Sequence, residues 1–188
     1  KDAADGFARN ERADQQGVDR QPRRTGHQRR NNNGGEAIAR VREARDTDIA
    51  HRTAPVTGVS EFPNLAEQPL DASRRGGDDY RYGRAFEDLR DRSDAHLEAT
   101  GSRPTVLLAG LGPQAETTPR VTFVANLLAA GGIEARNPGV TEAGQYATAR
   151  EGEDIAVLCS ADKRYATEGE AAVRALRDAG VSTVYLAG

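Results

Sequence analysis

The sequence predicts an α/β protein with a doubly wound parallel sheet in residues 103–188. Two observations support this prediction. Short apolar runs alternate with helical segments at spacings that imply right-handed crossovers between parallel strands. In addition, a glycine turn follows the first of these runs, in LLAGLGPQAETTPR, at the sheet edge where such folds place their ligands.

Four segments are expected to form the strands of this sheet, namely 105–111, 133–136, 155–160 and 181–187. The last of them, within VSTVYLAG, would leave an exposed hydrophobic edge. We therefore expect either that a partner covers this edge or that the natural protein continues, so that the domain is truncated at its C-terminus.

Three helical segments are expected between the strands. The first should begin with Thr118 as its N-cap and Pro119 as its first helical residue, and end at Gly131 and Gly132. Its expected buried face comprises Val121, Phe123, Val124, Leu127 and Leu128.

The second helix should follow Thr141 as its cap, and the third should run from about 163 to 179, with Asp162 as its N-cap and Gly180 as its stop. The expected buried residues of the third helix are Tyr165, Ala172, Val173 and Leu176.

Two zones precede this domain. Residues 1–33 contain Phe7 and Val18 as their only large apolar side chains, which predicts a disordered tail. Its basic cluster QPRRTGHQRR lacks interleaved aromatic residues, so a solvated tail is favoured over a nucleic-acid arm. Residues 34–102 are predicted to form a connector, with a helix from Glu36, an extended segment at 56–62, a linker at 71–79 and a second helix at 82–97 that Gly101 ends.

Composition restricts the partners and the compartment. The 188 residues include 26 basic and 29 acidic side chains and carry a net charge of −3, which gives no reason to expect nucleic acid or an anionic membrane as a partner. The single cysteine, Cys159, permits neither an intrachain disulfide nor a thiolate metal cluster, and a reducing cytoplasmic setting is the simplest inference. No apolar run approaches the roughly 18 residues of a membrane span. The lack of methionine suggests a fragment.

The glycine loop matches a dinucleotide pattern by spacing alone. Gly110, Gly112 and Ala115 fit G-x-G-x-x-A, and Glu134 lies near the distance expected for a ribose-binding acid. A dinucleotide site needs a helix that begins within the glycine turn, whereas the expected cap at Thr118 places that start several residues late. Pro113 also removes an amide donor. A nucleotide-dependent oxidoreductase domain is therefore only an alternative.

From about Glu36 onward, the chain resembles the small, non-catalytic subunit of bacterial methylmalonyl-CoA mutases. The resemblance rests on five sequence segments, PVTGVSEFPNLAE, YRYGRAFEDLRDRSDAH, RPTVLLAGLG, TFVANLLAAGGIEA and DIAVLCSADKRYA. The resemblance implies a flavodoxin-like domain at 103–188, and it implies that residues 34–102 contain the end of a barrel domain and a connector. It also implies adenosylcobalamin at the level of a heterodimer, held by a large catalytic partner that interconverts methylmalonyl-CoA and succinyl-CoA.

The cobalamin loop of that family's large chain reads Asp-x-His-x-x-Gly, and its histidine ligates cobalt. Aligned without a gap, Gln114 falls at the Asp position, Glu116 at the His position and Pro119 at the Gly position, and no histidine follows His96. Ser160 matches the Ser of the family's Ser-x-Leu element, but Asp162 replaces its Leu. Imidazole suits cobalt better than a loop carboxylate does. We expect no metal ligand and no cofactor-binding residue in this chain, with Gly112, Glu116 and Ser160 as remnants.

The other polar residues have simpler structural explanations. His27, His51 and His96 are expected at the surface, and Cys159 as a buried strand thiol. Asp162 and Lys163 could form a functional pair, although an N-cap explains Asp162. A solvated turn is expected at Glu151, Glu153 and Asp154.

We therefore expect a supporting small subunit with no catalytic residue of its own, bound to a large mutase chain in the cytoplasm. A cobalamin-binding carrier domain is the leading alternative.

Overall fold

A computed structural model describes residues 26–68 and 80–188, and the side chains from residue 34 onward. The first part of the predicted tail, the side chain of His27 and the linker at 71–79 lie outside the described residues. The chain divides into two units, Lys1–Glu43 and Ala44–Gly188, and the boundary falls within the first helix.

Helix α1 (Gly26–Ala50) contains the helix predicted from Glu36 but begins earlier. It includes residues 26–33, which the sequence assigned to the disordered tail. Low hydrophobicity argues against a core, but it does not prevent local helical hydrogen bonds, which explains the difference. The side chains of Ile38 and Val41 are exposed, whereas Ile49 is buried.

The sheet of the second unit has four parallel strands in the order β2-β1-β3-β4. Its strands are β1 (Thr105–Gly110), β2 (Glu134–Arg136), β3 (Ile155–Cys159) and β4 (Thr183–Ala187). This order is that of the flavodoxin-like folds, with the switch point between β1 and β3. The predicted fold class is confirmed, and each strand lies within the range that the sequence indicated.

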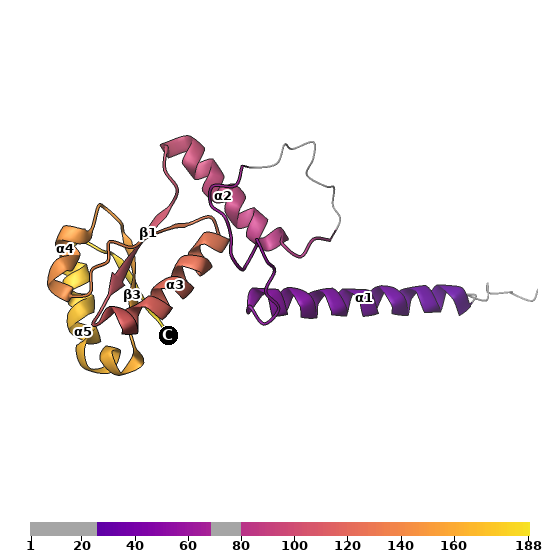
Figure 1. The fold of residues 1–188 in the computed structure, drawn as a ribbon. Helices are drawn as coiled ribbons and strands as arrows, with labels where there is room; N and C mark the ends of the chain where they lie inside the picture. Colours follow the sequence, from indigo (N-terminus) through magenta and orange to yellow (C-terminus); the bar gives the residue numbers. More distant parts are fainter. Residues whose placement is uncertain (1–25, 69–79) are drawn as a thin grey trace, which may run out of the picture. The chain divides into compact units, whose positions relative to one another are not determined.

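Helices cover both faces of this sheet (Figure 1). α3 (Gln114–Ala130) packs on one face, where Val124 and Leu128 meet Val106, Leu108 and Val157. The other face carries the short helices η2 (Ala143–Gln145) and α4 (Tyr146–Ala149), and α5 (Asp162–Asp178). The core on that side includes Leu107, Leu158, Tyr146, Ala172 and Leu176.

The start and the buried face of α3 differ from the prediction. The helix begins at Gln114 after Pro113, and Pro119 lies inside it. Thr118 is therefore not the N-cap, and its hydroxyl donates to the carbonyl oxygen of Gln114 at 2.7 Å.

Phe123 and Leu127 are exposed by 46% and 43%, because the helix turns Val121, Val124 and Leu128 toward the sheet instead. The ring of Phe123 faces the guanidinium of Arg52, whose Cζ lies 5.3 Å from the ring centroid.

Helix α2 (Arg84–Thr100) matches the predicted connector helix and ends at Gly101, whose φ is +83°. Its Ser93 is buried and donates to the carbonyl oxygen of Gly132, which follows α3. Arg90 donates to the carbonyl oxygen of Ala130 at 3.1 Å. These bonds join the connector to the α/β domain. The preceding segment, predicted to be extended, instead forms turns with an isolated bridge between Thr57 and Glu61.

Candidate functional site

The glycine turn after β1 is built by two close backbone contacts. A Cβ at Gly110 would stand 2.6 Å from the carbonyl oxygen of Val140. Gly112 has φ of +89°, where other residues are strained, and its N–H donates to the carbonyl oxygen of Thr141 at 2.8 Å. Both glycines are thus required by the path of the chain, independently of any ligand.

Helix α3 starts directly after this turn. The late helix start, one of the two grounds against a dinucleotide site, is therefore wrong. The reason is that Pro113, whose ring fixes φ near its value of −57°, occupies the position directly before the first helical residue. Thr118 and Pro119 therefore lie inside the helix and do not start it. The second ground remains, because Pro113 has no amide hydrogen to offer to a phosphate.

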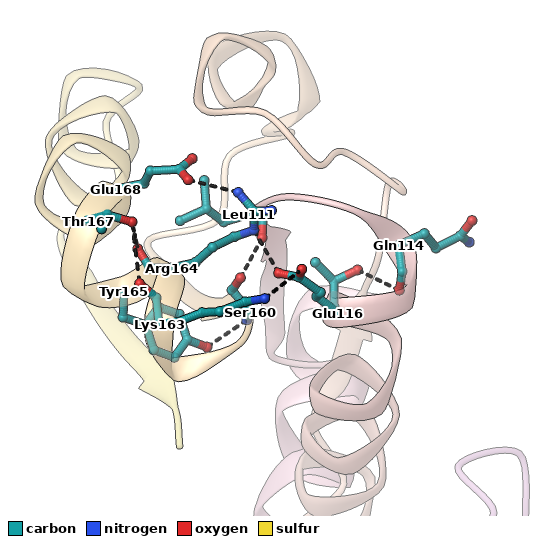
Figure 2. Close-up of polar contacts among 10 residues, drawn as sticks. Leu111, Gln114, Glu116, Ser160, Lys163, Arg164, Tyr165, Thr167 and Glu168 are labelled. Carbon is teal, nitrogen blue, oxygen red and sulfur yellow. Dashed lines mark hydrogen bonds and ion pairs between the residues drawn. The ribbon is translucent and has the colours of Figure 1, made fainter.

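Glu116, which the alignment places at the cobalt-ligand position, projects from the first turn of α3 toward α5 (Figure 2). Its Oε2 accepts a hydrogen bond from Nε of Arg164 at 2.7 Å, and its Oε1 lies 3.4 Å from Nζ of Lys163. The hydrogen bond from Arg164 is the main cause of a lowered pKa of Glu116; burial opposes it, and Lys163 contributes further lowering. The carboxylate is therefore charged at neutral pH and holds two cations.

The side chain of Arg164 lies over the glycine turn. A Cβ built on Gly112 would overlap Nε of Arg164 and stand 2.6 Å from its Cζ. On its other side, Nη1 of Arg164 donates to Oε1 of Glu168 at 2.8 Å (Figure 2). The surface of the turn that faces α5 is therefore covered by a side chain of the same molecule.

Ser160 is fully buried and its hydrogen bonds are made within the chain. Its hydroxyl donates to the carbonyl oxygen of Leu111, and its N–H donates to the hydroxyl of Tyr165 at 2.6 Å. The Tyr165 hydroxyl also lies 3.0 Å from the carbonyl oxygen of Leu158 and 2.8 Å from that of Ala187. Tyr165 and Ser160 thus join the ends of β1, β3 and β4, and the Ser160 hydroxyl is not presented to a ligand.

Asp162 is the first residue of α5 and not its N-cap, which is Ala161. Its carboxylate accepts from Nη2 of Arg120 on α3 at 3.1 Å, and this ion pair replaces the expected capping bond. The possible pair of Asp162 and Lys163 is not formed by these contacts, because Lys163 reaches Glu116 instead. Opposite charges therefore join α3 and α5 at two places.

Glu153 is a buried residue that the sequence did not reveal, because it was expected in a solvated turn. Its side chain is 5% exposed and accepts a hydrogen bond from Nε of Arg136, while Nη2 of Arg136 donates to the carbonyl oxygen of Ala149 at 2.5 Å. The neighbouring acids Glu151 and Asp154 are exposed, as expected. No spacing signal marks Glu153, because it lies in the loop before β3 and its partner Arg136 is on β2.

The two histidines whose side chains the structure describes do not contribute to this site. His51 is exposed at the end of α1 and His96 is exposed on α2. Within the part of the chain that the structure describes, no three His, Cys, Asp or Glu side chains come together as a metal site would require.

None of the described helices combines the length and the apolar character needed to cross a bilayer.

The residues at this loop do not fit cobalamin. A lower axial ligand needs a free donor, preferably an imidazole nitrogen. Glu116 is instead occupied by Arg164 and Lys163, and no histidine exists in residues 97–188. Gln114 and Pro119, the other aligned positions, lie within α3 and supply no replacement.

Fold and site together define a flavodoxin-type α/β domain whose loop after β1 is covered by its own side chains. No protein-family model matches the chain. The chain is 51% identical over 154 residues to a protein of Mycobacterium tuberculosis described as "Probable methylmalonyl-CoA mutase small subunit". It is 47% identical over 163 residues to the methylmalonyl-CoA mutase small subunit of Streptomyces virginiae and 33% identical over 149 residues to that of Propionibacterium freudenreichii subsp. shermanii.

These matches cover 80%, 82% and 74% of this chain, respectively. The chain is thus a homologue of methylmalonyl-CoA mutase small subunits, and the resemblance found in the sequence is confirmed. It spans about a quarter of the length of these relatives, since the matches cover 25%, 26% and 23% of them.

Proposed function

We propose that this chain is part of a small, non-catalytic subunit of an adenosylcobalamin-dependent methylmalonyl-CoA mutase in the cytoplasm. In this proposal a large partner chain holds the cofactor and interconverts methylmalonyl-CoA and succinyl-CoA. The present chain supports that partner in a heterodimer and contributes neither a cobalt ligand nor a catalytic residue.

One observation carries the proposal beyond the names of the relatives. The carboxylate of Glu116, at the position that the resemblance assigns to the axial histidine, is held by Arg164 and Lys163. To ligate cobalt, Glu116 would have to give up both cations, and a carboxylate would still be a poor match for this metal. A domain of this kind can keep its fold for association after its ligand chemistry has been lost.

The proposal is tested by titrating the purified chain with adenosylcobalamin and recording the visible absorbance. We expect no saturable change from replacement of the lower axial base. A saturable change in the wild-type chain would instead favour the cobalamin-binding carrier domain, with Glu116 as the first ligand to replace by glutamine.

Association is tested separately by mixing the chain with a purified large mutase chain and measuring the mass of the product by light scattering. We expect a complex containing both chains. Two separate species at micromolar concentrations would contradict the supporting role of this segment, whatever the cofactor titration shows.

A nucleotide-dependent oxidoreductase remains the second alternative, and the early start of α3 is the observation in its favour. Pro113 and the position of Arg164 over Gly112 argue against it. A titration of the chain with NADH distinguishes the oxidoreductase from the supporting subunit. NADH fluorescence should change in a saturable manner if the chain binds the nicotinamide, and should stay that of free NADH if it does not.

A further inference from the structure

The first two turns of α3 and the first turn of α5 form two ion pairs with each other at the carboxyl ends of β1 and β3. α3 supplies the acid Glu116 and the base Arg120, and α5 supplies the acid Asp162 and the base Arg164. Each acid pairs with the base of the other helix. In a flavodoxin-like fold this is the edge at which ligands bind.

We propose that Arg164 is a built-in ligand of the glycine loop, and that its guanidinium fills the space over Gly112 that a cofactor or nucleotide would need. This inference deepens the proposed function, because a loop filled by the protein itself leaves the cofactor to the partner chain. The site formed by Glu116, Glu168 and the Gly112 turn accordingly recognises a planar guanidinium cation.

The hydrogen bonds of Arg164 indicate that its guanidinium is bound in a specific site and is not only in contact with the surface. Nε donates to Glu116 on α3 and Nη1 donates to Glu168 on its own helix, so two edges of the planar group are bound by carboxylates. Such a planar fork of donors matches carboxylates in a way that a lysine ammonium cannot. The side chains of Arg164 and Glu116 are 25% and 24% exposed.

The same helix contains a natural comparison. Arg174 and Glu170 form an ion pair of 3.0 Å on α5, but their side chains are 67% and 85% exposed. Exposed pairs of this kind contribute little to stability, because solvent screens them and two long side chains must be ordered. A larger effect on stability of Arg164→Ala than of Arg174→Ala is therefore caused by the site around Arg164 and not by the general effect of removing an arginine.

The first experiment is chemical rescue of the purified 188-residue chain, followed by thermal unfolding in circular dichroism. Arg164→Ala should lower the Tm by roughly 3 °C, whereas Arg174→Ala should change it by less than about 1 °C. Ethylguanidinium replaces the atoms that Arg164→Ala removes. At millimolar concentration it should raise the Tm of that variant in a saturable manner, because it binds the folded state.

Wild type, Arg174→Ala and the same titration with ethylammonium should show no such rise. An equal response of both variants, or an equal effect of ethylammonium, would overturn the proposal of a guanidinium site. If Arg164→Ala does not fold on its own, the same rescue is measured as recovery of the folded circular-dichroism signal when ethylguanidinium is added, with ethylammonium again as the control.

The second experiment tests whether Arg164 covers Gly112. Gly112→Ala adds a Cβ that overlaps Nε of Arg164, so in the wild type it should displace the guanidinium as well as strain the turn. In the Arg164→Ala background only the strain remains. The Tm loss caused by Gly112→Ala should therefore be smaller in that background, and additive losses would refute the occupancy of the loop by Arg164.

Failure of this inference can be distinguished from failure of the proposed function. The role of Arg164 alone would be refuted if the Tm losses of Gly112→Ala and Arg164→Ala are additive and ethylguanidinium does not rescue Arg164→Ala, while adenosylcobalamin causes no spectral change with the wild-type chain. A saturable cobalamin spectrum in the wild type would remove the proposed function, and it would show that the loop admits a ligand despite Arg164.

Discussion

The phenolic hydroxyl of Tyr146 donates a hydrogen bond to the carbonyl oxygen of Gly110 at 2.8 Å, and the Tyr146 side chain is fully buried. Gly110 is the last residue of β1, and α4 is only a single turn. Burial also raises the pKa of Tyr146 far above its usual value, so the hydroxyl is protonated and can donate at neutral pH. This one bond connects the crossover after β2 to the strand that carries the glycine turn.

Tyr146→Phe is expected to destabilise the fold by about 1–2 kcal/mol, because it leaves the buried carbonyl oxygen of Gly110 without its donor while keeping the ring. Urea unfolding measures the loss. Tyr185→Phe is the control: Tyr185 is 58% exposed, so its change should stay within about 0.5 kcal/mol. Equal effects of the two variants would mean that the Tyr146 hydrogen bond does not contribute.

The contact between the connector and the α/β domain can be tested at Gly132. A Cβ at this residue would stand 2.8 Å from Cβ of Ser93, and φ is +80°. Gly132→Ala should therefore combine backbone strain with a clash and cost about 2–3 kcal/mol in urea unfolding.

Gly139→Ala is the matched control for this prediction. Gly139 has a similar φ of +75°, and apart from Gly139 itself and its two chain neighbours no atom lies within 4 Å of the place that a Cβ would take there. This variant should lose only the cost of the strained backbone, about 1 kcal/mol. Equal losses of unfolding free energy in Gly132→Ala and Gly139→Ala would show that Ser93 of α2 does not pack closely against the end of α3.

The strands and the helix ends follow from local signals in the sequence. The aliphatic runs at 105–111 and 155–160 contain the observed β1 and β3, because central parallel strands are apolar on both faces. Gly101 and Gly180 end their helices, as predicted, with φ of +83° and +95°. The start of α3 was mispredicted because two prolines compete, and local rules favour Pro119 with its preceding Thr118 over Pro113.

The site was predicted only in part, for a physical reason. Glu116 could be singled out by its alignment to a ligand position, but its partner Arg164 is 48 residues away in the chain. Spacing rules for helices and strands reach only a few residues, so they could not join the two. Glu153 was misjudged in the same way, because Arg136 lies 17 residues before it on β2.

Cys159 is expected to react slowly with thiol reagents. It is fully buried at the end of β3, and burial raises the pKa of its thiol to about 11, with a smaller opposing effect of Arg120. At pH 8 only about one thiol in a thousand is then ionised, and the thiolate is the reactive form. The reaction with an aromatic disulfide, followed by absorbance, should be at least about 100-fold slower than in the urea-unfolded chain. Comparable rates in the two states would contradict the burial of this strand end.

The acid sensitivity of the fold is expected to depend on Glu153. Burial alone would raise the pKa of its carboxyl group. Hydrogen bonds from Arg136 and from the backbone N–H of Glu151, together with the charge of Arg136, outweigh burial and lower this pKa to about 2. The folded pKa is thus below the ordinary value of 4.5. The ionised group therefore stabilises the fold above pH 4.5, and this stabilisation is lost as the pH falls toward 2.

Glu153→Gln should therefore lower the free energy of unfolding by about 3 kcal/mol at pH 7 and by less than half of that at pH 3, since a shift of one pKa unit corresponds to about 1.4 kcal/mol. Urea unfolding of variant and wild type at several pH values gives this difference directly, and other carboxylates that titrate in both proteins cancel. Glu151→Gln is the control, because Glu151 lies 3.6 Å from Arg136 but its side chain is 75% exposed. Its effect should stay below about 0.5 kcal/mol at every pH. A difference between wild type and Glu153→Gln that does not change with pH would show that Glu153 contributes by packing and not by its charge.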